Sequence, residues 1–376
     1  MIYSEFKGKK LSALGLGCMR LPVIGGDDSR VDEAAVFEMV DYALAHGINY
    51  FDTAWGYHGG NSETAIGKAL NRHPRDSFFI ADKFPGYDVS NFKKVKEIFE
   101  EQLKKCGVEY FDFYLFHTVA ESNIDGYLNP EFGVFEFLSE QKRNGKIRHL
   151  GFSAHGGMHV LNRFLDKYGK EMEFGQLQIN WLDWTFQNAK EKVELFKKFG
   201  IPVWVMEPVR GGKLAMLSDA AFEKLQKLRP EASRAEWAFR FLQSIPEVKV
   251  TLSGMSNFEQ LKENIAVYEE KKPLDERETG TLLEMAAGLK DAYKVPCTMC
   301  RYCMSYCPQG INIPNTLEAY NQQALRLSGA QSTFAAGADS DNRPTKCISC
   351  KSCEAVCPQQ IKITEFFADF NAMLTN

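Results

Sequence analysis

Eight cysteines near the end of the chain form two copies of one spacing pattern. Each copy reads C-x2-C-x2-C-x3-C and is followed at once by proline, Pro308 in the first and Pro358 in the second. Thiolates are soft ligands, and this spacing is typical of a loop and short helix that wrap a cubane iron–sulfur cluster. The two copies therefore predict two [4Fe-4S] clusters, held by Cys297, Cys300, Cys303, Cys307, Cys347, Cys350, Cys353 and Cys357.

The ligands of the two clusters are expected to cross between the copies. In this arrangement three cysteines of a run hold one cluster, and the fourth, next to proline, reaches the other. The expected sets are Cys297, Cys300, Cys303 and Cys357 for one cluster, and Cys347, Cys350, Cys353 and Cys307 for the other. A pair of zinc sites is an alternative, but zinc usually takes two close pairs of ligands. The last quarter of the chain resembles bacterial two-cluster ferredoxins, which implies a small α+β ferredoxin-like domain.

Composition limits the classes of partner. The chain has 376 residues with 45 basic and 49 acidic side chains, so its formal charge is −4. This near balance gives no electrostatic footprint for nucleic acid or anionic lipid. Residues 1–10 are polar rather than a signal sequence, and no segment is long and apolar enough to span a membrane. We therefore expect a cytoplasmic protein with no nucleic acid and no membrane as partner, in which clustered thiols indicate metal rather than disulfides.

Strand-like and helix-like segments alternate between residues 11 and 270. The expected strands are 11–17, 49–52, 78–81, 111–116, 147–152, 174–180, 201–206 and 248–253. Eight strand–helix units over this length fit a (β/α)8 TIM barrel, an α/β fold of about 250 residues. A doubly wound open sheet is the alternative, but the glycine-rich fingerprint that it would carry after the first strand is missing.

The domain organisation follows from these two patterns. We expect a barrel over residues 1–270, a charged and then helical linker over 271–295, and the two-cluster domain over 296–376. The long connection between the cysteine runs contains an expected helix over 316–325. It then becomes rich in small polar residues, which predicts a surface loop over 329–344.

Four reactive side chains follow strands two to four of the expected barrel. Asp52, Lys83 and His117 lie at the ends of these strands, and Tyr57 lies five residues past Asp52. In such barrels, reactive residues come from the C-terminal ends of the strands. A lone histidine there is more often a satisfied core residue, and a lone lysine is usually solvated. Their conjunction at neighbouring strand ends indicates a proton-donating site.

The four residue types suit proton donation to a carbonyl group. Tyrosine has a pKa of about 10, which is too high for ready proton release at neutral pH. An adjacent ammonium, here Lys83, favours the phenolate and lowers that pKa. Asp52 is expected to hold Lys83 in place and keep it charged. A neutral His117 can donate a hydrogen bond to a substrate carbonyl oxygen and orient it.

Residues from about 3 to 268 resemble the aldo-keto reductase family. The resemblance is carried by Phe51-Asp52-Thr53-Ala54-Trp55-Gly56-Tyr57 with Ser62-Glu63, by Lys83 and by Leu115-Phe116-His117. It implies a catalytic tetrad of Asp52, Tyr57, Lys83 and His117. It also implies hydride transfer between a nicotinamide and the carbonyl carbon of a small molecule, with Tyr57 as general acid.

The same resemblance implies contacts to NADP(H) or NAD(H). The implied positions are Gly17, Met19, Arg20, Asp52, Ser153, His155, Gln176, Met206, Arg210, Gly212, Gly254, Ser256, Gln260, Glu263 and Asn264. Met206 stands where the family has an aromatic residue that stacks on nicotinamide, and Ala154 replaces an asparagine. Arg210 begins a stretch that resembles the pyrophosphate loop. No arginine or lysine stands where the 2′-phosphate is usually held, so the choice of dinucleotide stays open.

The two halves of the chain carry electrons differently. A hydride carries two electrons, whereas a cubane cluster passes one at a time. One hypothesis is an NAD(P)H-dependent carbonyl reductase whose clusters are structural or mediate docking. A second is a reductase fed by a ferredoxin-like donor, with a flavin or a redox-active substrate in the barrel, although no motif supports flavin. A third is a redox-sensing binding module without catalysis, against which the complete tetrad argues.

Overall fold

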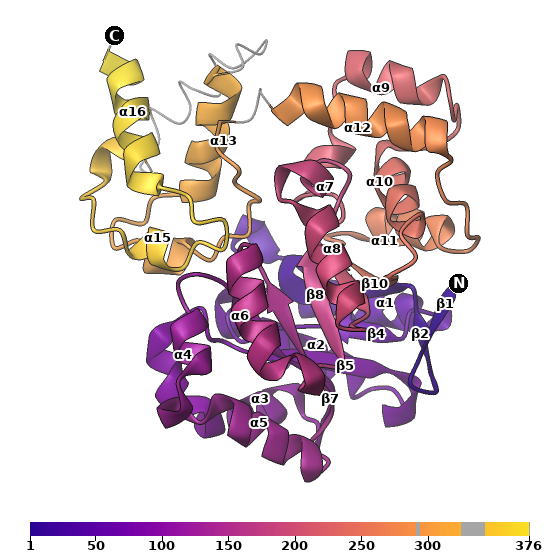
Figure 1. Ribbon diagram of the computed structural model, residues 1–376. Helices are drawn as coiled ribbons and strands as arrows, with labels where there is room; N and C mark the ends of the chain where they lie inside the picture. The colour runs from indigo at the N-terminus through magenta and orange to yellow at the C-terminus, as the bar shows by residue number, and fades with distance from the viewer. Residues whose placement is uncertain (291–293, 325–342, 376) are drawn as a thin grey trace. The chain divides into compact units, whose positions relative to one another are not determined.

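The chain folds into two compact units. They comprise Met1–Thr281 and Leu282–Asn376. Among the described residues, no helix is long and apolar enough to cross a membrane. The computed structural model (Figure 1) describes residues 1–290, 294–324 and 343–375.

The division between the units falls inside a helix. Helix α12 (Glu276–Lys290) begins in the first unit and continues into the second, within the segment 271–295 that the sequence predicted as a linker. The helix predicted over 316–325 is present as α13 (Ile313–Ala324). Most of the loop predicted over 329–344 lies outside the described residues.

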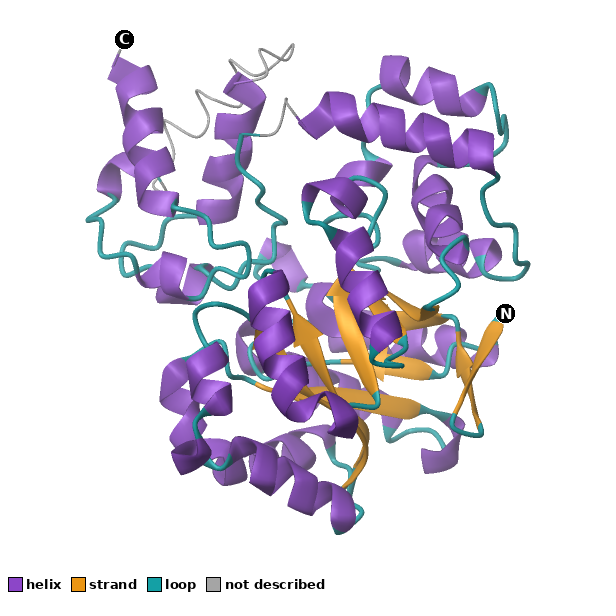
Figure 2. Ribbon diagram, in the orientation of Figure 1, coloured by secondary structure: helices purple, strands orange, loops and turns teal. Residues whose placement is uncertain are grey.

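Eight parallel strands close into a barrel in the first unit (Figure 2). They are β3 (Leu14–Gly17), β4 (Tyr50–Asp52), β5 (Phe79–Phe84), β6 (Phe111–Val119), β7 (Ile147–Ala154), β8 (Phe174–Gln178), β9 (Val203–Met206) and β10 (Val248–Ser253). They follow this order around the barrel, and β10 pairs with both β9 and β3. Strands covered on both faces are rich in apolar residues, and all nine residues of β6 are buried. The predicted barrel is confirmed.

Helices lie outside the strands (Figure 2). Those of the first unit are α1 (Glu33–Ala45), α2 (Ser62–Leu70), α3 (Val95–Cys106), α4 (Ile124–Leu128), α5 (Val134–Arg143), α6 (Met158–Tyr168), α7 (Asp183–Phe186), α8 (Ala189–Lys198), α9 (Asp219–Gln226), α10 (Arg234–Gln243) and α11 (Phe258–Val267). Each turns its apolar residues inward: α6, for example, buries Val160, Leu161, Phe164 and Leu165. The helices therefore fix the positions of the strand ends that carry the reactive residues.

The first predicted strand, 11–17, is divided in the structure. Its beginning belongs to β2 (Lys9–Ser12), which pairs antiparallel with β1 (Tyr3–Phe6), and its end is β3 of the barrel. The chain bends at Ala13, directly after Ser12, whose backbone N–H donates to the Asn49 side chain over 2.8 Å. Both pieces are apolar because Phe6 and Leu11 of the hairpin pack into the same core cluster as the barrel strands. The continuous apolar run in the sequence therefore gave no indication of the break between β2 and β3.

The second unit contains helices and loops. In residues 294–324 and 343–375 the structure has α13, α15 (Ser352–Ala355) and α16 (Ile363–Thr375) but no strand, so the β part of the expected α+β domain is not found there. Its cysteine segments instead coil, because Met299, Arg301, Ser349 and Lys351 have positive φ angles of 54–65°. Left-handed residues of this kind interrupt an extended strand.

The second unit repeats itself beyond the cysteines. Cys307-Pro308-Gln309 and Cys357-Pro358-Gln359 are followed by residues with φ of 63° and 51°, Gly310 and Gln360. The N–H of each donates to the carbonyl of the preceding cysteine, Cys307 or Cys357, over 3.0 Å. Helices α13 and α16 then begin at Ile313 and Ile363. Extending the cysteine runs by these residues would have shown this repeat in the sequence.

Replacing Phe6 by alanine should destabilise the first unit. Phe6 is 5% exposed and its ring lies 5.1 Å from that of Trp204, edge to face. Removing a buried phenylalanine typically costs about 3–5 kcal/mol, which scanning calorimetry should show as a lower unfolding temperature. Ile24→Ala, at a residue that is 45% exposed, is the control. Equal unfolding temperatures for the two variants would contradict a role of the hairpin in the core.

Candidate functional site

The structure brings the four predicted catalytic residues together at the C-terminal end of the barrel. Asp52 ends β4, Lys83 and His117 lie near the ends of β5 and β6, and Tyr57 begins the short 3-10 segment after β4. The Lys83 Nζ lies 2.6 Å from Asp52 Oδ1 and 3.4 Å from the Tyr57 hydroxyl. The rings of Tyr57 and His117 lie 6.0 Å apart, at 78° to each other.

The ammonium of Lys83 is buried and held from several sides. Lys83 is 1% exposed, and its Nζ also donates to the Thr53 carbonyl over 2.6 Å. Burial alone would lower the pKa of Lys83, but the charges of Asp52 and Tyr57 outweigh it and raise the pKa. Gln176 donates to the other carboxylate oxygen of Asp52 over 2.7 Å. Lys83 is therefore a fixed positive charge next to the Tyr57 hydroxyl.

His117 is neutral in this environment. Burial, and then the ammonium of Lys83 and the His155 ring, lower the pKa of His117 well below its usual range. Tyr87, in the loop after β5, packs edge to face on the His117 ring with centroids 5.4 Å apart. The Tyr87 hydroxyl lies against the Cα of Gly56, where a Cβ would clash with it. Sequence reasoning missed Tyr87, although an aromatic residue four positions after Lys83 was a visible signal.

A buried polar network fixes the backbone of Lys83. Gln102 on α3 donates to Glu63 Oε1 over 3.0 Å, to Asp82 Oδ1 over 2.9 Å and to the Lys83 carbonyl over 3.0 Å. The Lys83 N–H donates to Asp82 Oδ1 over 2.8 Å. Burial, and then the carboxylate of Glu63, raise the pKa of Asp82 well above its usual range. Asp82 and Gln102 together therefore hold the backbone of Lys83 on both its N–H and its carbonyl side.

The predicted nicotinamide contacts lie at the ends of β7 to β9. Ser153 is opposite Gln176, and Gln178 is opposite Met206. Two of their polar atoms already have partners: Ser153 Oγ accepts from the Thr118 N–H over 2.8 Å, and Gln176 donates to Asp52. His155 follows β7, where burial and then the Lys192 ammonium lower its pKa to about 3. His155 is therefore a neutral hydrogen-bonding group.

The structure places Arg210 inside the protein. Its Nε lies 3.2 Å from Asp183 Oδ1, and both side chains are fully buried. Asp183 also accepts from Gln178 over 2.8 Å and from Asn180 over 2.7 Å. The guanidinium thus anchors the loop that ends at Gly212 to Asp183, a partner that sequence reasoning missed. The contact of Arg210 to a dinucleotide stays a prediction.

The remaining predicted dinucleotide contacts gather along β3, β10 and the start of α11. Arg20 packs over Gly254, where a Cβ would lie 3.0 Å from the Arg20 side chain. Gln260 accepts from the Ser256 N–H over 2.8 Å, and Asn264 donates to Ser253 over 3.2 Å. The other members of this group are Gly17 at the end of β3, Met19 in the turn that follows, and Glu263, exposed on α11.

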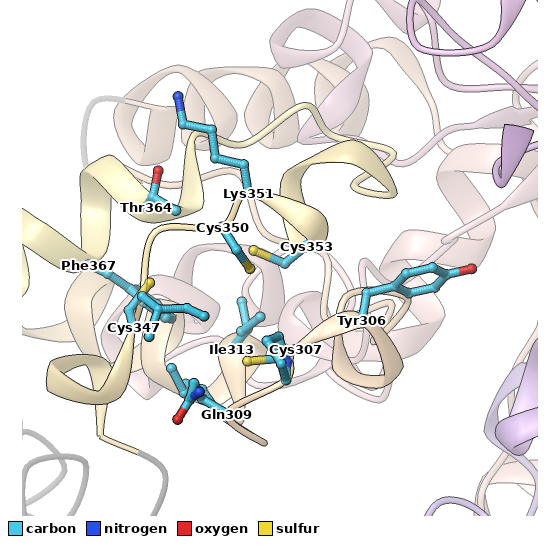
Figure 3. Close-up of a pocket in the computed structure, with 13 residues that line it drawn as sticks. Tyr306, Cys307, Gln309, Ile313, Cys347, Cys350, Lys351, Cys353, Thr364 and Phe367 are labelled. Atoms are coloured by element: carbon cyan, nitrogen blue, oxygen red, sulfur yellow. The ribbon is translucent and has the colours of Figure 1, made fainter.

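Two cavities in the second unit are each lined by four cysteines. One is lined by Cys297, Cys300, Cys303 and Cys357. The other, shown in Figure 3, is lined by Cys307, Cys347, Cys350 and Cys353. These are the two sets that cross between the runs. Among the described residues, no three His, Cys, Asp or Glu side chains lie close enough to hold a single metal ion, so the thiols surround a space rather than a point.

The cysteine segments suit a thiolate-bound cluster. The backbone N–H of Met299 lies 3.4 Å from Cys297 Sγ, and that of Ser349 lies 3.4 Å from Cys347 Sγ. Such N–H groups stabilise negative charge on sulfur. Burial raises the pKa of Cys353 to about 12, so this thiol would lose its proton only on binding a metal. The residues therefore fit two iron–sulfur clusters.

Comparison with known families identifies both units. Residues 13–286 match the Aldo/keto reductase family. The chain belongs to this family. Residues 296–361 match the 4Fe-4S dicluster domain, so the aldo/keto reductase barrel is followed by an iron–sulfur domain.

Individual relatives cover mainly the barrel. The NADH-specific methylglyoxal reductase of Escherichia coli is 26% identical, over 74% of this chain and 96% of that protein. The probable aldo-keto reductase 1 of Glycine max is 29% identical, over 55% of this chain and 58% of that protein. The holo form of an aldo-keto reductase from Bacillus halodurans matches with a TM-score of 0.61 at 24% identity. It covers 76% of this chain and 96% of that one, which shows the shared fold.

Replacing Cys300 by serine should remove one cluster. The wild-type chain should hold about eight irons and the variant about four, because a hydroxyl is a poor substitute for a thiolate ligand. Iron analysis and electron paramagnetic resonance of the anaerobically purified proteins measure this. Cys106→Ser, at a buried cysteine of α3 in the other unit, is the matched control. Full iron content in Cys300→Ser would refute the ligand set.

Proposed function

We propose that this aldo/keto reductase reduces the carbonyl group of a small aldehyde or ketone with a nicotinamide dinucleotide as hydride donor. The observation that carries the proposal is the placement of the Lys83 ammonium between Asp52 and the Tyr57 hydroxyl, at 2.6 and 3.4 Å. The name of the E. coli relative, a methylglyoxal reductase, supports a small carbonyl substrate.

The roles of the side chains follow from their charges. The bound nicotinamide would supply a hydride to the carbonyl carbon. Lys83 stabilises negative charge on the Tyr57 oxygen, so Tyr57 can give its proton to the carbonyl oxygen. His117, neutral and buried, donates a hydrogen bond that orients this oxygen. Asp52 keeps Lys83 charged, and Gln176 keeps Asp52 in place.

Replacing Tyr57 by phenylalanine should lower kcat for carbonyl reduction. The loss of a general acid typically costs about 10²–10⁴-fold, and the ring itself would still fill its place. Anaerobic oxidation of NADH with methylglyoxal and simple aldehydes as substrates measures the rate. Tyr42→Phe, on α1, is the matched control. Unchanged kcat in Tyr57→Phe, with both clusters intact, would rule out its role as acid.

We further propose NADH as the preferred dinucleotide. At the adenosine end, Glu259 and Glu263 of α11 are exposed and would repel a 2′-phosphate. Two cations nearby are engaged: Arg20 lies 3.7 Å from Glu207, and Lys262 lies over the Phe258 ring at 4.6 Å. The E. coli relative is itself named NADH-specific.

The preference should appear as a kcat/KM for NADH at least about tenfold above that for NADPH. Repulsion between the 2′-phosphate and a nearby carboxylate costs enough binding free energy to account for a factor of this size. Glu263→Lys should narrow the gap by improving NADPH alone. Steady-state kinetics with both dinucleotides test this. Equal kcat/KM values for NADH and NADPH in the wild-type protein would contradict it.

A second candidate function is favoured by Cys350, an exposed cysteine of the second predicted cluster set. In it, a protein donor feeds single electrons to the clusters, and a flavin or redox-active substrate in the barrel collects them. An anaerobic NADH titration followed by electron paramagnetic resonance separates the two. Clusters that NADH alone reduces would require such a bridge, whereas clusters that stay oxidised support direct hydride transfer.

A further inference from the structure

The two cysteine sets differ in exposure. In the first set, Cys297 and Cys303 are 7% and 8% exposed. In the second set, Cys350 is an exposed residue, and its neighbour Ile348 is 60% exposed. A cluster held by the second set would therefore lie close to the solvent-facing surface of its unit, which short-range electron transfer requires.

The surface around Cys350 is locally basic. Between residues 343 and 353 the chain has Arg343, Lys346 and Lys351, all exposed, and no acidic residue. In Figure 3 the ammonium of Lys351 points away from the thiols. We call Arg343, Lys346, Ile348, Cys350 and Lys351 the Cys350 surface. It stands out because the whole chain carries a formal charge of −4.

We propose that the Cys350 surface docks a small, acidic, one-electron carrier protein, which reduces the second cluster there. An exposed apolar side chain, flanked along the chain by the cations Lys346 and Lys351, matches a small, transient interface with a carrier of opposite charge. In the step, the reduced carrier loses one electron and the oxidised cluster gains one; no bond forms or breaks. We rest this proposal on the ligand set proposed for the second cluster, and not on carbonyl reduction.

Other occupants fit less well. Nucleic acid or anionic lipid would also be attracted by three cations, but neither exchanges an electron with a cluster. Two copies of this chain that met through their Cys350 surfaces would bring cations against cations, which is unfavourable. An acidic electron carrier uses both features, the cations and the exposed ligand.

The test is a charge reversal, Lys346→Glu with Lys351→Glu, in the full chain with both clusters. A strongly acidic bacterial ferredoxin, reduced beforehand, is mixed with the protein in an anaerobic stopped-flow instrument, and the cluster absorbance is followed. We expect the second-order rate constant to fall about tenfold or more at low salt. We also expect the wild-type rate to fall with ionic strength, because salt screens the attraction.

Three controls make the result specific. Reduced methyl viologen, a small cation that needs no docking site, should reduce the variant no more slowly than the wild type. Lys104→Glu, at a 79% exposed side chain in the barrel unit, makes one charge reversal elsewhere, and Lys351→Arg keeps the charge. Neither should change the ferredoxin rate. Iron content must equal that of the wild type in all variants.

The outcomes separate this proposal from the others. An unchanged ferredoxin rate in the double variant, or a wild-type rate that rises with salt, overturns it. Loss of binding to phosphatidylserine vesicles without an effect on electron transfer would assign the surface to lipid and also overturn it. Tyr57→Phe should keep the full ferredoxin rate, so failure of carbonyl reduction and failure of docking are seen independently.

Discussion

The ion pair between Lys83 and Asp52 is the interaction around which the barrel site is arranged. An ammonium that is 1% exposed is strongly unfavourable unless its charge and its hydrogen bonds are satisfied. Here Asp52 supplies the opposite charge and the Thr53 carbonyl supplies a further acceptor. The arrangement leaves the ammonium next to one group that it can affect chemically, the Tyr57 hydroxyl.

The rest of the site serves to keep this pair in one geometry. Gln176, from the opposite side of the barrel, occupies the second oxygen of Asp52, and Gln102 with Asp82 holds the backbone of Lys83. Burial, and then the same positive charge, lower the pKa of His117, so this histidine stays neutral beside the pair. Removing any one member leaves another polar group buried without its partner, which is why such networks act as a unit.

The second unit depends on a different constraint. Its cysteine segments follow left-handed turns around two cavities, and its helices pack on a small apolar core that includes Val295, Ile311, Leu317 and Phe367. Buried thiols such as Cys353 keep their protons until a metal binds, and the cavities that they line are filled only by the clusters. We therefore expect metal binding and folding to be coupled in this unit, whereas the barrel is stabilised by its own apolar core.

The sequence alone predicted the barrel with its eight strands, the tetrad and the two crossing cysteine sets. Each prediction rests on residues that are close in the chain: the alternation of strands and helices, the residues at strand ends, and the spacing of the cysteines. The C-terminal ends of all strands in a parallel barrel lie on the same face of the barrel, and this does not depend on the conformation of the loops. Spacing could not show the break at Ala13, since both pieces of the apolar run contribute buried residues. It also could not show that Arg210 faces Asp183, or that Gln102 links Glu63, Asp82 and Lys83. These contacts join residues far apart in the chain, and only the packing of helices on strands decides which buried polar groups become partners.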